Sequence, residues 1–248
     1  MVMTEMHRGS CHGRDNAEVD VVKAVADVEE RQQHNQGGEG AWEAARKACG
    51  EADAFAIQSN ERGIVARDSG AFAWEIVPIE VPVGRGKPPV LIEKDESLDK
   101  FDPAKLKKLR PSFKENGGTV TAGNASSISD GAAALVLVSG QKAQELGLQV
   151  LARIRGYADA AQAPELFTTT PALAIPKAIA NAGLESSHVD FYEINEAFSE
   201  KINVHGGAVS LGHPLGCSGA RILVTLLGVL SMSRLGTTEA VVPLLTES

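Results

Sequence analysis

The sequence predicts an α/β fold, because apolar segments of strand length alternate with segments that favour helices. Residues 132–138 and 150–157 are apolar runs of the kind that a sheet buries on both faces. Residues 171–182 favour a helix, and residues 189–194 form the next predicted strand. In proteins built this way, functional side chains gather where strands end.

The first third of the chain predicts helices joined to one edge strand. Residues 18–31 have amphipathic spacing, and the polar residues 30–40 indicate a linker. Residues 41–67 are rich in alanine and predict a helix that Gly63 interrupts. Residues 71–83 indicate an edge strand, because two prolines divide them.

Residues 84–125 are predicted to be irregular apart from a short helix at 103–109. Such a stretch within a globular chain is either disordered or a binding loop. Five basic side chains occur here with no acid among them: Lys105, Lys107, Lys108, Arg110 and Lys114. They form either a solvated face or an attractive field for an anionic ligand, and Arg110 would meet a phosphate or pair with a surface acid.

Composition narrows the class of protein. At 248 residues with 43% hydrophobic content, the chain can bury a core of one or two domains. No apolar run has membrane-spanning length, and residues 1–12 lack the apolar segment of a secretory signal. The net charge of −8 argues against general nucleic-acid binding. Three scattered cysteines fit a reducing compartment, so we expect a cytoplasmic protein without a metal site.

Residues 203–221 carry the strongest functional signal. Five glycines in these nineteen residues surround the step His213-Pro214, and an apolar helical run follows. Pro214 restricts His213 to an extended conformation, which fixes the direction of the imidazole. Ser218 stands where a helix N-cap is expected. A histidine held on such a loop is a candidate catalytic residue.

Four blocks of this sequence resemble the thiolase family. They are Asn-Val-His-Gly-Gly-Ala-Val-Ser-Leu-Gly-His-Pro at 203–214, Asn-Glu-Ala-Phe at 195–198, the stretch 109–126, and Asp-Gly-Ala-Ala-Ala at 130–134. Their order is that of the family, and their wording is nearest to cytosolic acetoacetyl-CoA thiolases, which are acetyl-CoA C-acetyltransferases. The resemblance implies the layered αβαβα thiolase fold, here incomplete. It also implies three parts. Residues 1–52 would be a divergent segment and linker. Residues 53–140 would be the remainder of the thiolase N-terminal half, with a coenzyme A loop domain at about 84–125, and residues 141–248 would be the truncated C-terminal half.

The resemblance also assigns roles to single residues. His213 would activate a nucleophilic cysteine and polarise the thioester oxygen, and Asn195 would hold a water in the same oxyanion hole. Ala122 and Ser126 match positions that line the pantetheine channel, and Arg110 is a weaker candidate for a phosphate. Without the family, Asn195 could equally cap a helix and Ser126 could form a local turn.

The cysteines depart from the family pattern. A thiolase needs a nucleophilic cysteine in its N-terminal half and a second one in a Cys-x-Gly turn, whereas Cys11, Cys49 and Cys217 lie in neither context. Cys217 is a weak candidate, because a helix start lowers a thiol pKa but the family accepts alanine there. A helix after Asn-Glu-Ala-Phe and the C-terminal cysteine turn are also missing.

The implied reaction is a Claisen condensation of two acetyl-CoA molecules through an acyl-cysteine, and we expect it to be impaired in this chain. Coenzyme A thioester would be a substrate, with no tightly bound cofactor. The expected partners are copies of the chain or a full-length thiolase. The alternatives are a non-catalytic CoA-binding or oligomer-modulating protein, and an unstable fragment whose apolar surface is left uncovered.

Overall fold

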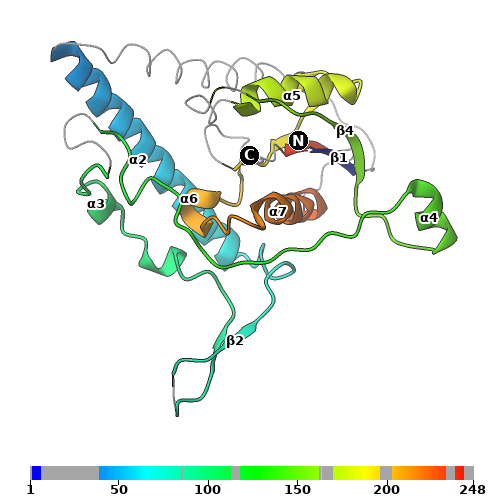
Figure 1. Ribbon diagram of the computed structural model, residues 1–248, viewed down its shortest axis with the longest axis horizontal. Coiled ribbons are helices and arrows are strands. Elements are labelled where there is room, and N and C mark those ends of the chain that lie inside the picture. The colour runs from blue at the N-terminus through cyan, green and yellow to red at the C-terminus, as the bar shows by residue number, and fades with distance from the viewer. Residues whose placement is uncertain are drawn as a thin grey trace.

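The computed structural model describes residues 2–6, 39–84, 86–112, 118–161, 163, 170–195, 203–232 and 238–242 (Figure 1). The helices are α2 (Glu39–Asp68), α3 (Pro103–Leu106), α4 (Gly140–Glu145), α5 (Thr170–Asn181), α6 (Ala208–Leu211) and α7 (Ser218–Met232). Short 3-10 turns lie at Leu98–Lys100 (η1) and Ser186–His188 (η3). The strands are β1 (Val2–Met6), β2 (Ile79–Val81), β3 (Val90–Ile92), β4 (Arg153–Tyr157), β5 (Phe191–Tyr192) and β6 (Thr238–Val242).

Four strands form a mixed sheet in the order β4-β1-β6-β5. Strand β1 pairs antiparallel with both neighbours, so that Val2 faces Tyr157 on one side and Val242 on the other. Strand β5 runs parallel to β6. Helix α5 lies on one face of this sheet and α7 on the other (Figure 1). The predicted α/β class is therefore confirmed.

Two clusters of buried apolar side chains cover the two faces of the sheet. On the α5 side, Ile175, Ala178 and Ile179 are buried against Val189 and Tyr192. A Cβ on Gly156 of β4 would lie 2.8 Å from the Ala178 carbonyl oxygen of α5 and 2.8 Å from the backbone N of Ala182 just after the helix, so the glycine permits this close approach.

On the α7 side, Ile222, Leu226 and Leu230 are buried at intervals of four residues, which gives the helix one apolar face. Phe191 of β5 packs against that face. The apolar run after the histidine thus forms a helix, as the sequence predicts.

Helix α2 is longer than predicted and passes through Gly63 without interruption. The glycine has a packing role, because a Cβ there would lie 2.9 Å from Leu98 Cδ2. Gly70, at φ 77°, ends the helical turn, and Ala71 and Phe72 then fold back and are buried against Ala66. The strand predicted at 71–83 is therefore reduced to β2, which pairs with β3 alone.

Residues 132–138 do not form the predicted buried strand. In the described part of the chain no strand pairs with them, and they run past α7 toward α4 (Figure 1). Val136 is 88% and Leu137 73% exposed. A strand exists only where a neighbour satisfies its backbone groups, so apolar composition alone predicted the wrong state here.

Other predicted elements are present but shorter. Strand β4 lies within 150–157, β5 within 189–194 and α3 within 103–109, while α5 accommodates Pro176 inside the helix. The helix predicted at 18–31 and residues 30–38 of the linker fall outside the described residues. Helix α2 crosses residues 52 and 53 without a break, and the proposed domain division stays a prediction. Among the described helices, none is long and apolar enough to cross a membrane.

Candidate active site

The backbone of His213 is fixed by a neighbouring segment. Its N–H donates to the Ser127 carbonyl at 2.7 Å, and the Ser129 N–H donates to the His213 carbonyl at 3.4 Å. Ile128 therefore forms a parallel bridge with His213. Gly212 just before it has φ 90°, and a Cβ there would lie 2.5 Å from Ser129 Oγ, so this position requires glycine.

The imidazole of His213 is oriented by Ser218. Ser218 Oγ lies 2.6 Å from Nδ1 and 3.3 Å from the Pro214 carbonyl. Two arrangements fit these distances: the hydroxyl donates to Nδ1, or Nδ1–H donates to the hydroxyl, which then donates to the Pro214 carbonyl. In the first arrangement Nε2 carries the proton and can donate to an oxygen. Ser218 was predicted as an N-cap, but it is the first residue of α7 and its side chain turns to His213.

Asn203 joins the histidine loop to the end of β5, a role that the sequence reasoning missed. Its Oδ1 accepts from the Ile194 N–H at 2.8 Å, and its Nδ2 donates to the Ile194 carbonyl at 2.9 Å. Its own N–H donates to the Tyr192 carbonyl. Asn203 has φ 48°, a conformation that asparagine tolerates better than most residues, and this preference was the available signal.

Asn195 follows this fixed residue directly. It is half-buried, and its Oδ1 is buried without a hydrogen-bond partner among the described residues. A buried polar atom without a partner marks a position where a ligand or water would bind. The helix that Asn195 might cap, 196–199, lies outside the described residues. The clamp at Ile194 thus brings Asn195 to the loop that carries His213.

A serine cluster anchors the same loop on α2. Ser59 Oγ accepts from the Gly207 N–H at 3.1 Å and donates to Ser210 Oγ at 3.1 Å. Ser97 Oγ donates to the Ser210 carbonyl at 2.6 Å. A Cβ on Gly206 would lie 2.8 Å from the Ser59 carbonyl oxygen, so the loop backbone rests directly on the helix.

The predicted ligand-binding residues lie on two connected segments. Ser126 is half-buried and precedes Ser127, which accepts from His213, so the structure brings Ser126 beside the histidine loop. Ala122 and Arg110 are exposed, and the bridge between Pro111 and Thr121 places their segments together. Among the described residues, no hydrogen bond or ion pair joins Arg110 to the His213 loop.

The segment of Ala122 is attached to α2. Asn124 Nδ2 donates to Asp53 Oδ1 and to the Thr119 carbonyl, each at 2.9 Å. Its Oδ1 accepts from the Thr121 N–H. A turn tied down in this way presents Ala122 on a fixed backbone.

The cysteines show no catalytic arrangement in the described part of the chain. Cys217 is half-buried in the turn before α7, where its Sγ would lie 3.5 Å from a Cβ on Gly131. Its thiol has no hydrogen bond to His213, whose Nδ1 is engaged by Ser218. Cys49 lies within α2, and Cys11 lies outside the described residues.

His205, the other histidine of this loop, packs against an aromatic ring. Its ring stands edge-on to Phe72, with centroids 5.8 Å apart and an interplanar angle of 87°. Burial lowers the pKa of its imidazole, which favours the neutral form. This neutral ring packs beside the site.

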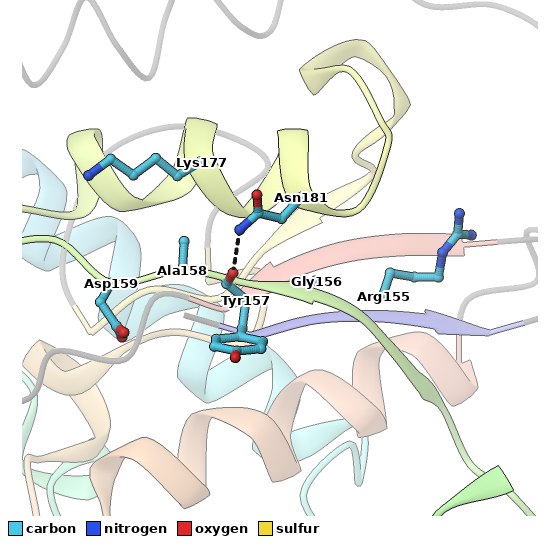
Figure 2. A pocket seen from close by; sticks show the side chains of 7 residues that line it. All are labelled: Arg155, Gly156, Tyr157, Ala158, Asp159, Lys177 and Asn181. Carbon is cyan, nitrogen blue, oxygen red and sulfur yellow. Dashed lines mark hydrogen bonds between the residues drawn. The ribbon is translucent and has the colours of Figure 1, made fainter.

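A pocket of about 590 Å³ lies elsewhere, between β4 and α5 (Figure 2). It is lined by residues 155–159 together with Lys177 and Asn181, and Asn181 Nδ2 donates to the Tyr157 carbonyl at 2.8 Å. None of the predicted site residues lines it. Among the described residues, no group of three or more His, Cys, Asp or Glu side chains could hold a metal ion.

The chain is similar to acetyl-CoA acetyltransferases. It is 75% identical over 194 residues to Acetyl-CoA acetyltransferase 1 of Arabidopsis thaliana, covering 73% of this chain and 47% of that protein. It is 51% identical over 192 residues to Acetyl-CoA acetyltransferase ERG10, cytosolic, of Gibberella zeae, covering 72% and 48%. The chain thus spans about half the length of the curated relatives it matches.

Solved structures of acetyl-CoA acetyltransferases and thiolases are also similar to this chain. The acetyl-CoA acetyltransferase of Bacillus anthracis superposes with a TM-score of 0.74 at 34% identity, covering 95% of this chain and 62% of that one. The Acat5 thiolase from Ascaris suum, solved in complex with coenzyme A, gives 0.64 at 37% identity, covering 73% and 49%. These neighbours establish the thiolase fold.

Family profiles match both parts of the chain. The thiolase N-terminal domain matches residues 2–141, and the thiolase C-terminal domain matches residues 148–244. The first match reaches into the N-terminal segment in which the sequence analysis found no resemblance. Taken with the fold and the histidine loop, these matches show that the chain belongs to the thiolase family.

Proposed function

We propose that this chain is an acetyl-CoA acetyltransferase relative that retains the polarising half of the thiolase site and has lost the acyl-carrying half. The observation that carries the proposal is the 2.6 Å contact between Ser218 Oγ and His213 Nδ1, which, with the hydroxyl donating, leaves Nε2–H as a donor for a thioester oxygen. Asn195 supplies the second polar group, through a water that it would hold. Donors arranged beforehand around a developing oxyanion are each worth roughly 3 kcal/mol of barrier.

The proposed ligand is a coenzyme A thioester. Ser126 lies one residue from the segment that pairs with His213, and Ala122 lies on the turn fixed by Asn124. These positions would line the pantetheine channel, and Arg110 would meet a phosphate. The complex of the Ascaris suum thiolase with coenzyme A supports this choice of ligand.

Turnover by this chain is proposed to be impaired. In the intact reaction a cysteine takes the acetyl group and releases CoA, and the carbanion of a second acetyl-CoA then attacks the acyl-enzyme. Neither family cysteine context occurs in the sequence. Cys217 is the remaining candidate beside the histidine loop, although Ser218 already engages His213 Nδ1.

The experiment is intact-protein mass measurement of the folded chain after incubation with acetyl-CoA, with peptide mapping and parallel calorimetry of CoA binding. We expect CoA binding without a stoichiometric acetyl adduct. An adduct on Cys217 that disappears in Cys217→Ala would show a complete active site and overturn the impaired assignment. If calorimetry detects no CoA binding to the folded wild-type chain, the ligand assignment is overturned.

A second candidate function is a non-catalytic role in an oligomer, favoured by the exposed side chains of Ile128, Val136 and Leu137. Apolar surface of this kind is usually covered by a partner. The proposed partner is a second copy or a full-length thiolase in the cytoplasm. Co-purification with a full-length thiolase would support this role, and a stable monomer that does not bind the thiolase would exclude it.

The proposed assignment as a thiolase relative also includes the αβαβα layering, the loop domain at about 84–125 and the division into domains.

A further inference from the structure

Arg221 is a buried cation without a direct partner. It lies on α7, three residues after Ser218. Its Nε, Nη1 and Nη2 atoms are all buried without a hydrogen-bond partner among the described residues. A buried guanidinium is costly unless negative charge lies near it. Nearby carboxyl groups would therefore offset the cost of burying this charge on α7.

The region around Arg221 on α7 meets carboxyl groups from separate segments, since Thr225, one turn after Arg221, donates to Glu75, and Glu193 follows Phe191, which packs against α7. Glu75 follows the turn after α2, Asp95 precedes η1, and Glu193 follows β5. Glu193 is 1% exposed, and its Oε1 has no partner among the described residues. Glu75 Oε2 accepts from Thr225 Oγ1 at 3.0 Å, so α7 supplies both a charge and a donor.

Burial and charge act in opposite directions on these groups. Burial raises the pKa of Glu193 to about 8, Arg221 lowers it, and Glu75 raises it. Burial likewise raises the pKa of Glu75 to about 7, while Thr225 and Arg221 lower it and Asp95 raises it. The pKa of Asp95 is raised by burial and lowered by Arg221. One cation thus opposes the desolvation of three acids.

The cluster is close in sequence to both halves of the candidate site. Glu193 lies two residues before Asn195, and the intervening Ile194 is the residue that Asn203 clamps. Arg221 lies one turn after Ser218, which orients His213. Any shift of Glu193 relative to Arg221 would move the Asn195 segment relative to the His213 loop.

We propose that Arg221 is a positioning residue: its buried charge holds the carboxyl groups of Glu75, Asp95 and Glu193 around α7 and so fixes the Asn195 end of β5 behind His213. This role requires no acyl transfer by the chain, so it stands or falls separately from the proposed function. It is a property of the folded chain that pH and substitution can test.

The test is denaturant unfolding of the full chain across a pH series. A carboxyl whose pKa is raised in the folded state loses its proton on unfolding, so stability falls as pH rises from the unfolded pKa to the folded one. For the wild type this fall should level off above about pH 8. In Arg221→Met the pKa values rise further, so the folding equilibrium constant should keep falling above that pH, by about tenfold per pH unit for each carboxyl still titrating.

Three variants serve as comparisons. Arg221→Lys keeps the charge and should level off as the wild type does, and Arg221→Met combined with Glu193→Gln should lose part of the additional slope. Arg67→Met is the matched control, because Arg67 pairs with Asp68 and Asp99 at the surface, where Lys94 and then Arg67 lower the pKa of Asp99. Its effect should be confined to acid pH.

Hydrogen exchange of the peptide 189–195 reads the positioning directly. After correction for intrinsic rates, Arg221→Met should raise exchange at Ile194 by about tenfold or more near pH 9, with helix α5 unchanged. A loss of stability that is equal at every pH, with exchange at Ile194 unchanged, would reduce Arg221 to a packing residue. If Arg221→Met does not fold, Glu193→Gln alone must flatten the fall between about pH 5 and 8, and an unaltered profile would overturn the proposal.

Discussion

The side chain of Asn203 hydrogen-bonds both backbone groups of Ile194, with distances of 2.8 and 2.9 Å. These two hydrogen bonds fix the start of the histidine loop to the residue that precedes Asn195. The neighbouring backbone bond from Asn203 to Tyr192 extends the same connection along the strand. The relative placement of the two proposed site segments therefore depends on Asn203, which has no role in the proposed chemistry.

Replacing Asn203 by alanine should destabilise the chain by about 2–4 kcal/mol, because two buried backbone groups lose their partners. The residue is 3% exposed, so water cannot replace them without rearrangement. Asn203→Asp should also destabilise, since its carboxylate would face the Ile194 carbonyl. Urea unfolding at neutral pH measures both effects.

Asn181→Ala is the control for that substitution. Asn181 also donates to a backbone carbonyl, that of Tyr157, but it is exposed on α5. Its loss should cost less than about 1 kcal/mol, because water can hydrate the freed carbonyl. Equal losses for Asn181→Ala and Asn203→Ala would mean that the clamp has no special role.

Gly212→Ala should disturb the histidine loop far more than Gly216→Ala. Gly212 has φ 90° and a Cβ there would lie 2.5 Å from Ser129 Oγ, whereas a Cβ on Gly216 meets nothing within 4 Å. We expect a loss of about 2 kcal/mol or more for Gly212→Ala and less than about 1 kcal/mol for Gly216→Ala. Thermal unfolding of the two variants, side by side, decides this, and similar melting temperatures would contradict the strain argument.

Ser218→Ala should change the tautomer of His213. Without the hydroxyl, Nδ1 loses the donor that leaves the proton on Nε2, so the population with the proton on Nδ1 should increase. Nitrogen NMR shifts of the histidine ring measure this population directly. Ser218→Thr keeps a hydroxyl and should retain the wild-type spectrum, and an unchanged spectrum in Ser218→Ala would assign the tautomer to another cause.

The histidine loop could be predicted from the sequence because its constraints are local. Glycine at positive φ and the restriction that Pro214 places on His213 depend on neighbouring residues alone. Helix α5 and strand β4 were predicted for the same reason, since their patterns lie within their own segments. The thiolase resemblance supplied the roles that local chemistry alone could not.

Long-range relationships could not be predicted in this way. Residues 132–138 have the composition of a buried strand, yet the described sheet offers them no neighbour and Val136 remains exposed. The spacing of α7 does not reveal that Arg221 meets carboxyl groups from positions 75, 95 and 193. Such contacts arise only when distant segments pack together, so the sequence alone did not predict these residues.

Glu75→Gln should remove one of the pH dependences of stability. Burial raises the pKa of Glu75 to about 7, so the folded state keeps a proton that the unfolded state releases, and stability falls as pH rises toward that value. Glutamine keeps an oxygen that can accept from Thr225 but does not titrate. At about pH 8 the variant should be more stable than the wild type by roughly 1–2 kcal/mol, and near pH 4 the two should be alike. Urea unfolding at both pH values measures the difference, and a constant offset between the two proteins would show that the Glu75 carboxyl titrates normally in the folded chain.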